Sequence, residues 1–272
     1  ILHSAIRGIS VCEETEESMV IRAGAAELWD NVVCYAVENG WGGIENLSYI
    51  PGETGGAAIQ NIGAYGVEIK DCIEKIETYN QLTREKQIFS REACEYGYRY
   101  SYFKNEHHDP HIVTYVYLRL TKKPRFALDY GHLATRLQDY PEITLSTVRD
   151  AVIRIRKEKL PKPEVLGNAG SFFTNPVISR EQFEKIRNSY PQIPSYPAGD
   201  ARVKVPAGWL IEQCGFKGKT HGPVGIYEKQ ALVIVNLGNA TGDEIALVAE
   251  SIRMAVSEQF GIDLVPEVKY VG

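Results

Sequence analysis

The chain has 272 residues, of which 44% are hydrophobic and 24% are charged, a composition typical of a folded globular protein and not of a disordered one. No apolar run approaches the roughly 20 residues that span a bilayer, so no membrane-spanning helix is expected. The net charge of −5 argues against an extensive nucleic-acid-binding surface, although a few cations could still surround a small anionic ligand.

Five cysteines are scattered along the chain and form no Cys-x-x-Cys pair. Neither a disulfide framework nor a structural zinc site is therefore expected, and a reducing compartment such as the cytoplasm suits the pattern. The chain opens at Ile1 with neither an initiating Met nor a signal peptide. We expect a sequence that begins inside a domain.

The first 120 residues predict a strand-rich region with one clear helix. Leu28, Val32 and Ala36 recur at helical spacing, and Gly40 stands where a glycine commonly ends a helix. Residues 73–79 and 112–120 carry Ile, Val, Thr and Tyr in partial alternation, which predicts two strands.

A second helix is predicted over 147–159. Ser146 is its expected N-cap, and Pro161 is expected to stop it. The composition changes over 159–170 (KLPKPEVLGNAG), where we expect the domain boundary.

The last hundred residues alternate helix and strand signals. Capping boxes are predicted at 179–182 and 241–244, and the second opens a helix that Gly261 should end. The inner stripe of that helix is expected to be Ile245, Val248, Ile252 and Val256. Residues 231–236 predict a buried strand, and 264–271 predict a closing strand. The fold class is α+β, in two domains.

Glycines interrupt the apolar segment 50–68 (IPGETGGAAIQNIGAYGVE). Such glycines can let successive N–H groups point at a phosphate, or they can simply form two tight turns. The segment lacks the G-x-G-x-x-G fingerprint, and 215–220 (GFKGKT) lacks the first glycine of a P-loop.

Two further segments hold candidate catalytic groups. Arg99 lies among aromatic residues in 96–104 (YGYRYSYFK), where it can offer a rigid donor fork or remain a solvated strand residue. Ser171 lies among small residues in 167–176 (GNAGSFFTNP), where a serine could deliver a proton or a plain turn could form. G-x-S-x-G is absent, so a hydrolase nucleophile is not supported.

Three histidines cluster in 107–111 (HHDPH). Pro110 prevents the helical spacing that would align metal ligands, so we expect a solvated loop and no metal site.

Taken together and in order, the segments strongly resemble one family. The resemblance rests on IPGETGGAAIQNIGAYGVE, YRYSYFK, GNAGSFFTNP, KVPAGWLIEQCGFKG, ALVIVN and LVPEVKYVG. These are similar to segments of the UDP-N-acetylenolpyruvoylglucosamine reductase (MurB) family, and the resemblance covers essentially the whole chain. It implies an FAD-binding region of the vanillyl-alcohol-oxidase type at 1–160, present in part. A substrate-binding α+β domain at 161–261 and a closing segment at 262–272 would follow.

The resemblance also implies roles for individual residues. Arg99, Ser171 and Glu267 match the catalytic residues. Tyr130, in the segment 127–133 (ALDYGHL), matches the tyrosine-bearing loop of the type I branch, which folds over bound substrate. The residues that match the nucleotide-sugar site are Lys159, Asn175, Lys217 and Gln230. Those that match the FAD site are Gly52, Gly55, Gly56, Gln60, Asn61, Gly63, Tyr65 and Gly66.

The activity implied is reduction of UDP-N-acetylglucosamine enolpyruvate to UDP-N-acetylmuramate, with FAD as cofactor and NADPH as hydride donor. Arg99 and Glu267 would stabilise developing charge, and Ser171 would deliver the proton. We expect a cytoplasmic monomer with no nucleic-acid or membrane partner. A non-catalytic nucleotide-sugar-binding module is the alternative from another class, and a flavin oxidase of the same fold is a weaker one.

The sequence departs from the family at both ends. Nothing before Ile1 supplies the family's Gly-Gly-x-Ser-Asn-like loop, which completes the FAD pyrophosphate site, and the chain stops at Gly272, where type I members continue. We therefore expect a truncated chain that binds FAD weakly or not at all.

Overall fold

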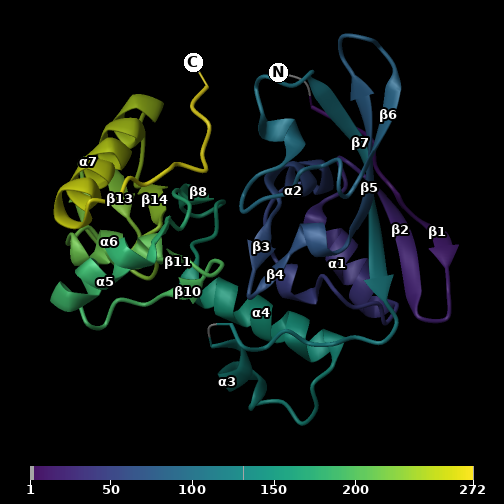
Figure 1. Cartoon of the computed structure of the whole chain (residues 1–272), viewed down its shortest axis with the longest axis horizontal. Helices are drawn as coiled ribbons and strands as arrows, with labels where there is room; N and C mark the ends of the chain where they lie inside the picture. The colour runs from purple at the N-terminus through teal and green to yellow at the C-terminus, as the bar shows by residue number, and fades with distance from the viewer. Residues whose placement is uncertain (1–2, 131, 272) are drawn as a thin grey trace. The chain divides into compact units, whose positions relative to one another are not determined.

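The computed structural model describes residues 3–130 and 132–271 and divides the chain into two compact units (Figure 1). The N-terminal unit is Ile1–Arg156 and the C-terminal unit is Lys157–Gly272. The division falls inside the last turn of a helix that continues to Lys159, close to the boundary expected after residue 160. Gly131, in the predicted tyrosine-bearing loop, lies outside the described residues.

A five-stranded antiparallel sheet in the order β1-β2-β7-β5-β6 is the centre of the N-terminal unit. Its strands are β1 (Ile9–Glu14), β2 (Ser18–Gly24), β5 (Ile73–Asn80), β6 (Lys86–Ser90) and β7 (His111–Thr121), and a small hairpin is formed by β3 (Gly63–Ala64) and β4 (Val67–Glu68). The predicted strands at 73–79 and 112–120 are therefore confirmed as β5 and β7.

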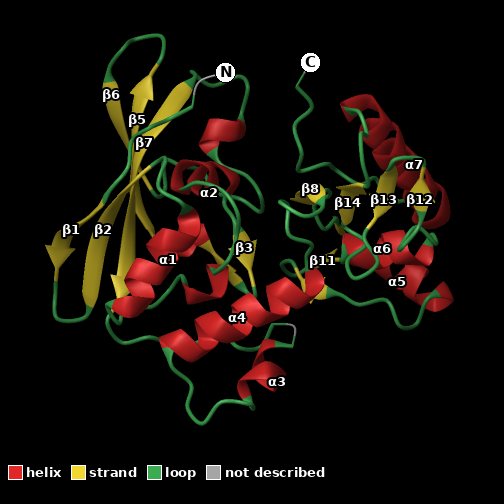
Figure 2. Ribbon diagram, turned by 180° about the vertical axis from the view of Figure 1, so that it is seen from behind, coloured by secondary structure: helices red, strands yellow, loops and turns green. Residues whose placement is uncertain are grey.

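The helices of this unit lie on one side of the sheet (Figure 2). They are α1 (Trp29–Glu38), α2 (Thr54–Gln60), α3 (Leu133–Leu137) and α4 (Leu145–Lys159), the last of which extends into the C-terminal unit. On the polar side of the sheet, the Arg22 guanidinium lies 3.4 Å from the Tyr115 ring centroid. One face is therefore apolar and helix-covered, while the other carries charged and aromatic residues.

Helix α1 begins one residue later than its apolar stripe suggested. Leu28 is the N-cap and is 47% exposed, and it forms an isolated bridge with Glu53, so it precedes the helix in which its spacing had placed it. Val32 and Ala36 are fully buried, and Gly40 follows the helix at φ 76°, as a terminating glycine does.

Helix α4 begins before its predicted N-cap. Ser146 lies inside the helix, so that prediction was wrong. Thr144 caps it instead, because its Oγ1 accepts the Thr147 N–H at 3.2 Å while its own N–H donates to Thr147 Oγ1 at 2.7 Å. Two threonines three residues apart form hydrogen bonds with the N–H groups at the start of the helix, which the serine between them does not.

An ion pair joins α4 to α1. Arg149 forms two parallel hydrogen bonds to the Asp30 carboxylate, at 2.7 and 2.8 Å. The Tyr49 N–H donates to the same carboxylate at 2.6 Å, and the Arg156 Nε–H donates to the Tyr49 carbonyl at 2.9 Å. The pair therefore fixes two helices and the loop between α1 and α2 at one point.

This pair should make stability depend on pH. Burial raises the pKa of Asp30, but the hydrogen bonds from Arg149 and Tyr49 outweigh it and leave that pKa below its ordinary value of 3.8. The stabilisation is complete above the ordinary pKa and is lost as the pH falls through the lower folded value. We expect Asp30→Asn to reduce the free energy of unfolding at neutral pH by about 2 kcal/mol, because it leaves the Arg149 charge half-buried and unpaired.

Urea unfolding at several pH values measures this effect. Glu181→Gln, which removes an exposed i,i+4 pair with Lys185, is the matched control and should leave the midpoint unchanged. A parent-like midpoint for Asp30→Asn at neutral pH would contradict the assignment.

The C-terminal unit contains two small sheets flanked by helices. A four-stranded sheet has the order β12-β13-β14-β8, and a three-stranded sheet has the order β10-β11-β9. The strands are β8 (Gly167–Ser171), β9 (Val177–Ser179), β10 (Tyr196–Pro197), β11 (Arg202–Lys204), β12 (Thr220–His221), β13 (Val224–Ile226) and β14 (Val233–Asn236). The helices are α5 (Arg180–Ser189), α6 (Ala207–Gln213) and α7 (Gly242–Phe260).

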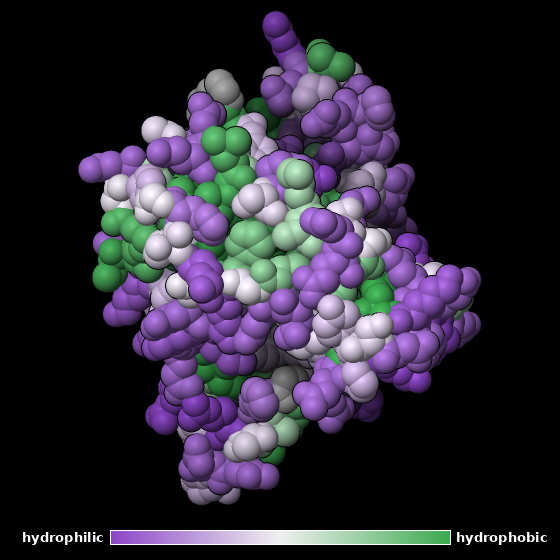
Figure 3. All heavy atoms as spheres, turned by 90° about the vertical axis from the view of Figure 1, so that its left-hand side faces the viewer, coloured by the Kyte–Doolittle hydropathy of each residue, from purple (hydrophilic) through white to green (hydrophobic). Residues whose placement is uncertain are grey.

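Helix α7 follows its sequence signals closely. Thr241 and Glu244 form the predicted capping box, and Gly261 ends the helix at φ 63°. On its outer side Leu247 and Met254 are 71% and 65% exposed, and Figure 3 shows apolar residues among polar ones on this face of the molecule. Among the described helices, none is long and apolar enough to cross a membrane.

Two other expectations for this unit need correction. Ser179 caps α5 through the Gln182 N–H, but the Gln182 side chain donates to the Gly261 carbonyl and does not complete a capping box. The closing strand predicted at 264–271 does not form; a single bridge pairs Phe173 with Pro266. Pro266 has no N–H to donate, so the ladder cannot continue through it.

Candidate functional site

The N-terminus of α2 lies in the glycine-rich segment. The Thr54 N–H donates to the Glu27 carbonyl and the Gly55 N–H to the Ala25 carbonyl, both at 2.9 Å. A Cβ on Gly55 would lie 2.9 Å from the Ala25 Cβ. These two amides therefore hold the α2 N-terminus against the chain that follows β2, and their N–H groups are used within the protein.

Two other glycines of the segment border open space. Gly52 has φ 116°, a conformation that favours glycine, and its carbonyl accepts the Trp29 N–H at 3.0 Å. A Cβ added at Gly52 or Gly56 would meet no heavy atom within 4 Å. A ligand can approach the backbone here.

Asn61, at the C-terminal end of α2, is the centre of a buried polar cluster. It is 0% exposed and adopts φ 47°. Its Nδ2 donates to Glu68 Oε2 at 2.9 Å and to the Gly97 carbonyl at 2.7 Å, while its Oδ1 accepts the Lys70 N–H at 3.2 Å. One amide side chain thus joins α2, the β3–β4 hairpin and the tyrosine-rich turn.

Arg99 lies against this cluster. Its Nη1 and Nη2 donate to the carbonyls of Asn61 at 3.3 Å and Gly63 at 2.9 Å. Lys104 Nζ donates to Gln60 Oε1 at 2.8 Å and to the Arg99 carbonyl at 3.0 Å. Arg99, the predicted catalytic arginine, therefore contacts the predicted cofactor residues Asn61 and Gly63 directly and Gln60 through Lys104. Lys104 was not assigned to the site, although it stands in the same motif.

Asn46 is a residue that sequence reasoning missed. Its Nδ2 donates to the carbonyls of Tyr65 at 2.9 Å and Ala127 at 2.8 Å, whereas its buried Oδ1 accepts no hydrogen bond. Burial raises the pKa of the Tyr65 hydroxyl. A Cβ on Gly66 would lie 3.5 Å from the Tyr130 Cβ, so the loop tyrosine borders the same region. Asn46 stands in 44–50 (IENLSYI) beside the polar residues Glu45 and Ser48, so the sequence pattern does not single it out.

This region fits the cofactor that the sequence resemblance implies. An unpaired buried carbonyl oxygen is costly unless a donor reaches it, and FAD offers an imide N–H and several hydroxyls. Asn61, Tyr65 and Arg99 of this region have φ between 47° and 53°, a backbone strain that often occurs at binding sites and that Arg84, Glu95 and Asn239 share elsewhere.

The C-terminal unit brings two predicted catalytic residues together. Ser171 is exposed at the end of β8, where it pairs with Val233. The Glu267 N–H donates to the carbonyl of Phe172 at 2.8 Å, and the Thr174 N–H donates to Val265 O at 2.9 Å. Glu267 is therefore attached by its backbone beside Ser171.

Three predicted nucleotide-sugar residues lie around α6. Asn175 Oδ1 accepts the Ala207 N–H at 2.9 Å, and Lys217 Nζ lies 2.9 Å from Glu212 Oε1. Gln230 approaches the first turn of the same helix. Lys159 is exposed at the end of α4, and no contact described for this unit joins it to the other three.

The histidine-rich segment is more ordered than a solvated loop. His108 stacks on Tyr102 with ring centroids 3.9 Å apart, and His111 Nδ1 lies 3.0 Å from Thr78 Oγ1. Phe89 packs against both Tyr102 and His111. Neighbouring aromatic rings partly cover His108 and His111, which corrects the expectation for these two, whereas His107 is exposed as expected.

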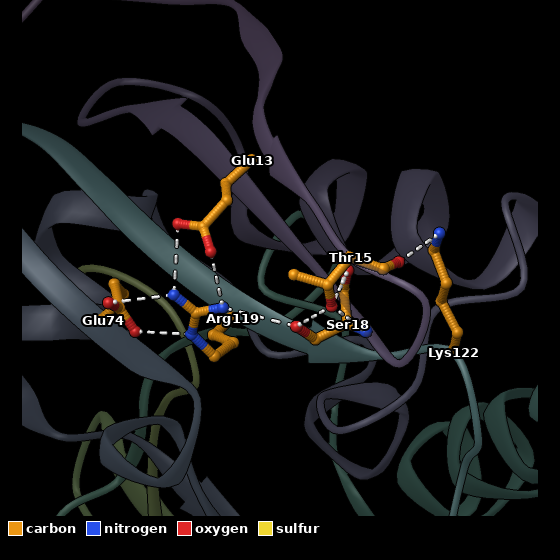
Figure 4. A network of polar contacts seen from close by, with 6 residues as sticks. All are labelled: Glu13, Thr15, Ser18, Glu74, Arg119 and Lys122. Carbon is orange, nitrogen blue, oxygen red and sulfur yellow. Dashed lines mark hydrogen bonds and ion pairs between the residues drawn. The ribbon is translucent and has the colours of Figure 1, made fainter.

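A polar network lies at the β1–β2 turn, away from these residues (Figure 4). Arg119 contacts Glu74 at 2.8 Å and Glu13 at 3.2 Å, and the hydrogen bonds that it donates to those carboxylates raise its pKa. A hollow of about 560 Å³ beside it is lined by Thr15, Glu16, Glu17, Ser18, Arg119, Leu120 and Thr121. The carboxylates already neutralise the guanidinium, so the network joins strands and does not form an anion site.

Comparison with known proteins gives consistent matches. Residues 162–271 match the family "UDP-N-acetylenolpyruvoylglucosamine reductase, C-terminal domain", and residues 3–81 match "FAD binding domain". The expected pairing of an FAD-binding region with a C-terminal α+β domain is thereby confirmed.

Relatives and a solved structure match over nearly the whole chain. UDP-N-acetylenolpyruvoylglucosamine reductases of Porphyromonas gingivalis and Bacteroides fragilis are 51% and 49% identical over 100% of this chain, which covers 80% and 81% of theirs. The crystal structure of UDP-N-acetylenolpyruvylglucosamine reductase (MurB) from Thermus caldophilus is 26% identical with a TM-score of 0.62, over 91% of this chain and 71% of that one.

Proposed function

This chain belongs to the UDP-N-acetylenolpyruvoylglucosamine reductase family, and from that premise we propose that it reduces UDP-N-acetylglucosamine enolpyruvate to UDP-N-acetylmuramate. NADPH is the hydride donor and FAD the cofactor, and the reaction serves peptidoglycan precursor synthesis. We assign FAD binding to the N-terminal region and nucleotide-sugar binding to the C-terminal unit, with Glu267 in the closing segment.

The observation that carries this proposal is the attachment of Glu267 beside Ser171. The hydrogen bond from Glu267 N–H to Phe172 O and the Phe173–Pro266 bridge hold the two chain segments together. A serine hydroxyl can deliver a proton in one direction only when its surroundings are fixed. Ser171 therefore protonates the carbon that carries the carboxylate, and Glu267 stabilises the charge that develops there.

Arg99 has a complementary role. Once reduced by NADPH, a bound flavin would supply the hydride that the methylene carbon of the enolpyruvyl group receives. The carboxylate and its neighbouring carbon then gain negative charge, which Arg99 stabilises. Its guanidinium is already oriented by the Asn61 and Gly63 carbonyls, so little reorganisation is needed.

The cofactor and substrate residues complete the proposal. Asn61 orients Arg99 through its carbonyl, and Gln60 reaches Arg99 through Lys104. The residues that we assign to the flavin site are Gly52, Gly55, Gly56, Gln60, Asn61, Gly63, Tyr65 and Gly66. Lys159 and Lys217 neutralise the diphosphate, Asn175 and Gln230 donate hydrogen bonds, and Tyr130 covers the substrate. We further propose a cytoplasmic monomer without nucleic-acid or membrane partners, in keeping with five free thiols and a net charge of −5.

NADPH consumption by the protein in the presence of added FAD tests the function. We expect oxidation of NADPH to accelerate when UDP-N-acetylglucosamine enolpyruvate is added and to stay at background with UDP-N-acetylglucosamine, which lacks the double bond. Nucleotide-sugar binding without NADPH consumption would contradict the reductase and favour the non-catalytic module.

A further inference from the structure

Helix α6 contacts each of three residues proposed to hold the nucleotide-sugar. Its first N–H, from Ala207, donates to Asn175 Oδ1, and its last turn carries Glu212, which pairs with Lys217. Between them Gly208 faces Gln230. Side chains from three separate loops are therefore brought to one short helix.

Gly208 has no conformational reason to be glycine. It does not have the positive φ that favours glycine, and it stands in the first turn of a helix, where glycine is less favourable than alanine by up to about 1 kcal/mol. A Cβ at this position would lie 2.9 Å from Gln230 Oε1, while the Leu232 Cγ at 3.5 Å is an ordinary contact. The missing side chain makes room for the Gln230 amide.

The Gln230 amide is constrained on the side of its oxygen. Oε1 accepts the Leu232 N–H at 3.3 Å and rests against Gly208. With the oxygen held there, Nε2 is the end of the amide that remains for a ligand, and an N–H₂ group suits a phosphate or carbonyl oxygen. The side chain is half-buried, so a hydrogen bond from it to a ligand would be partly shielded from water.

We propose that Gly208 is a positioning residue for the nucleoside-diphosphate-sugar site, because its lack of a side chain sets the place and orientation of the Gln230 amide. The inference rests on the proposed function, since that assigns Gln230 to the site. Gly208 itself does not touch the substrate. It determines affinity for the nucleotide-sugar and leaves the chemical step nearly unchanged.

Gly208→Ala tests the inference, with UDP as the probe in titration calorimetry on the whole chain. The atom that the new methyl meets is the end of a flexible side chain, so folding should persist and thermal stability should not fall. The displaced amide should weaken UDP binding about tenfold, the worth of one hydrogen bond to a charged group. In turnover, KM for the enolpyruvyl substrate should rise by the same factor with kcat little changed.

Two comparisons make the result specific. Gly242→Ala, in the first turn of α7 with no heavy atom within 4 Å, should bind UDP like the parent. In a Gln230→Ala background, Gly208→Ala should have no further effect, because there is no amide to displace.

If the Gly208→Ala protein does not fold, Gln230→Glu tests the nitrogen end of the same amide. Glutamate keeps the side-chain length but replaces the N–H₂ donor with an acceptor. UDP binding must then fall at least tenfold.

The outcomes separate this inference from the proposed function. If Gln230→Ala weakens UDP binding and Gly208→Ala does not, Gly208 is not a positioning residue and the site assignment stands. A loss from Gly208→Ala that persists without Gln230 also overturns the inference. Parent-like UDP binding by both Gln230→Ala and Gln230→Glu would remove Gln230 from the site, and the inference with it.

Discussion

Replacing Ser171 by Ala should lower kcat for reduction of the enolpyruvyl substrate by about 10²- to 10⁴-fold, the usual contribution of a positioned proton donor. The hydroxyl is exposed at the end of β8, so its loss should leave the fold and UDP binding unchanged. Reduction of the bound flavin by NADPH should continue at the parent rate, because that half-reaction needs no proton at the substrate carbon. Stopped-flow measurement of the two half-reactions separates these effects.

Ser189→Ala is the matched control for this experiment. Ser189 is exposed at the end of α5 in the same unit, away from β8, and its replacement should change neither half-reaction. If the Ser171→Ala protein reduced the enolpyruvyl substrate at the parent rate, Ser171 would not be the proton donor.

Arg99→Lys should lower kcat/KM by about 10²- to 10³-fold, the cost of removing one oriented donor that stabilises developing charge. The guanidinium makes hydrogen bonds to the Asn61 and Gly63 carbonyls through two nitrogens, and its planar fork stays oriented while it does so. An ammonium keeps the charge but cannot reproduce this geometry.

Binding of UDP serves as the internal comparison, because Arg99 is not assigned to the nucleotide subsite and UDP affinity should be unchanged. Arg91→Lys, at an exposed pair with Glu92, is the matched control and should keep parent activity. Parent kcat/KM for Arg99→Lys would show that charge alone suffices and would contradict the oriented-donor role.

Local signals in the sequence predicted the elements that depend on local physics. Thr241 and Glu244 bond reciprocally within one turn, so α7 could be located from four residues and its apolar stripe. Other predictions failed either because a distant partner decides the outcome or because a local signal was overlooked. Leu28 matches a helical stripe but instead pairs with Glu53, and Pro266 interrupts a segment that otherwise resembles a strand.

The candidate site follows the same division. The pattern around Arg99 identified the residue, but its partners Asn61 and Gly63 lie more than 30 positions earlier and are reached only through folding. The sequence left open whether the glycines form a phosphate cradle or tight turns, and the structure adds that Gly55 permits close packing on Ala25. Asn46 and Gly208 were missed because only their neighbours in space give them a role. The buried Asn46 Oδ1 accepts no hydrogen bond, and Gly208 leaves room for the Gln230 amide.

The central claim is that this chain reduces an enolpyruvyl nucleotide-sugar and delivers the final proton from a side chain. Mass and magnetic-resonance analysis of the product formed with NADPH and FAD in deuterium oxide tests it most directly. We expect UDP-N-acetylmuramate with one solvent-derived deuterium bound stereospecifically at the carbon that carries the carboxylate. A second deuterium is expected in the methyl group, because the N5–H of reduced flavin exchanges with solvent before the hydride is transferred. Recovery of unchanged substrate, whether NADPH is left untouched or is consumed with formation of peroxide, would contradict it.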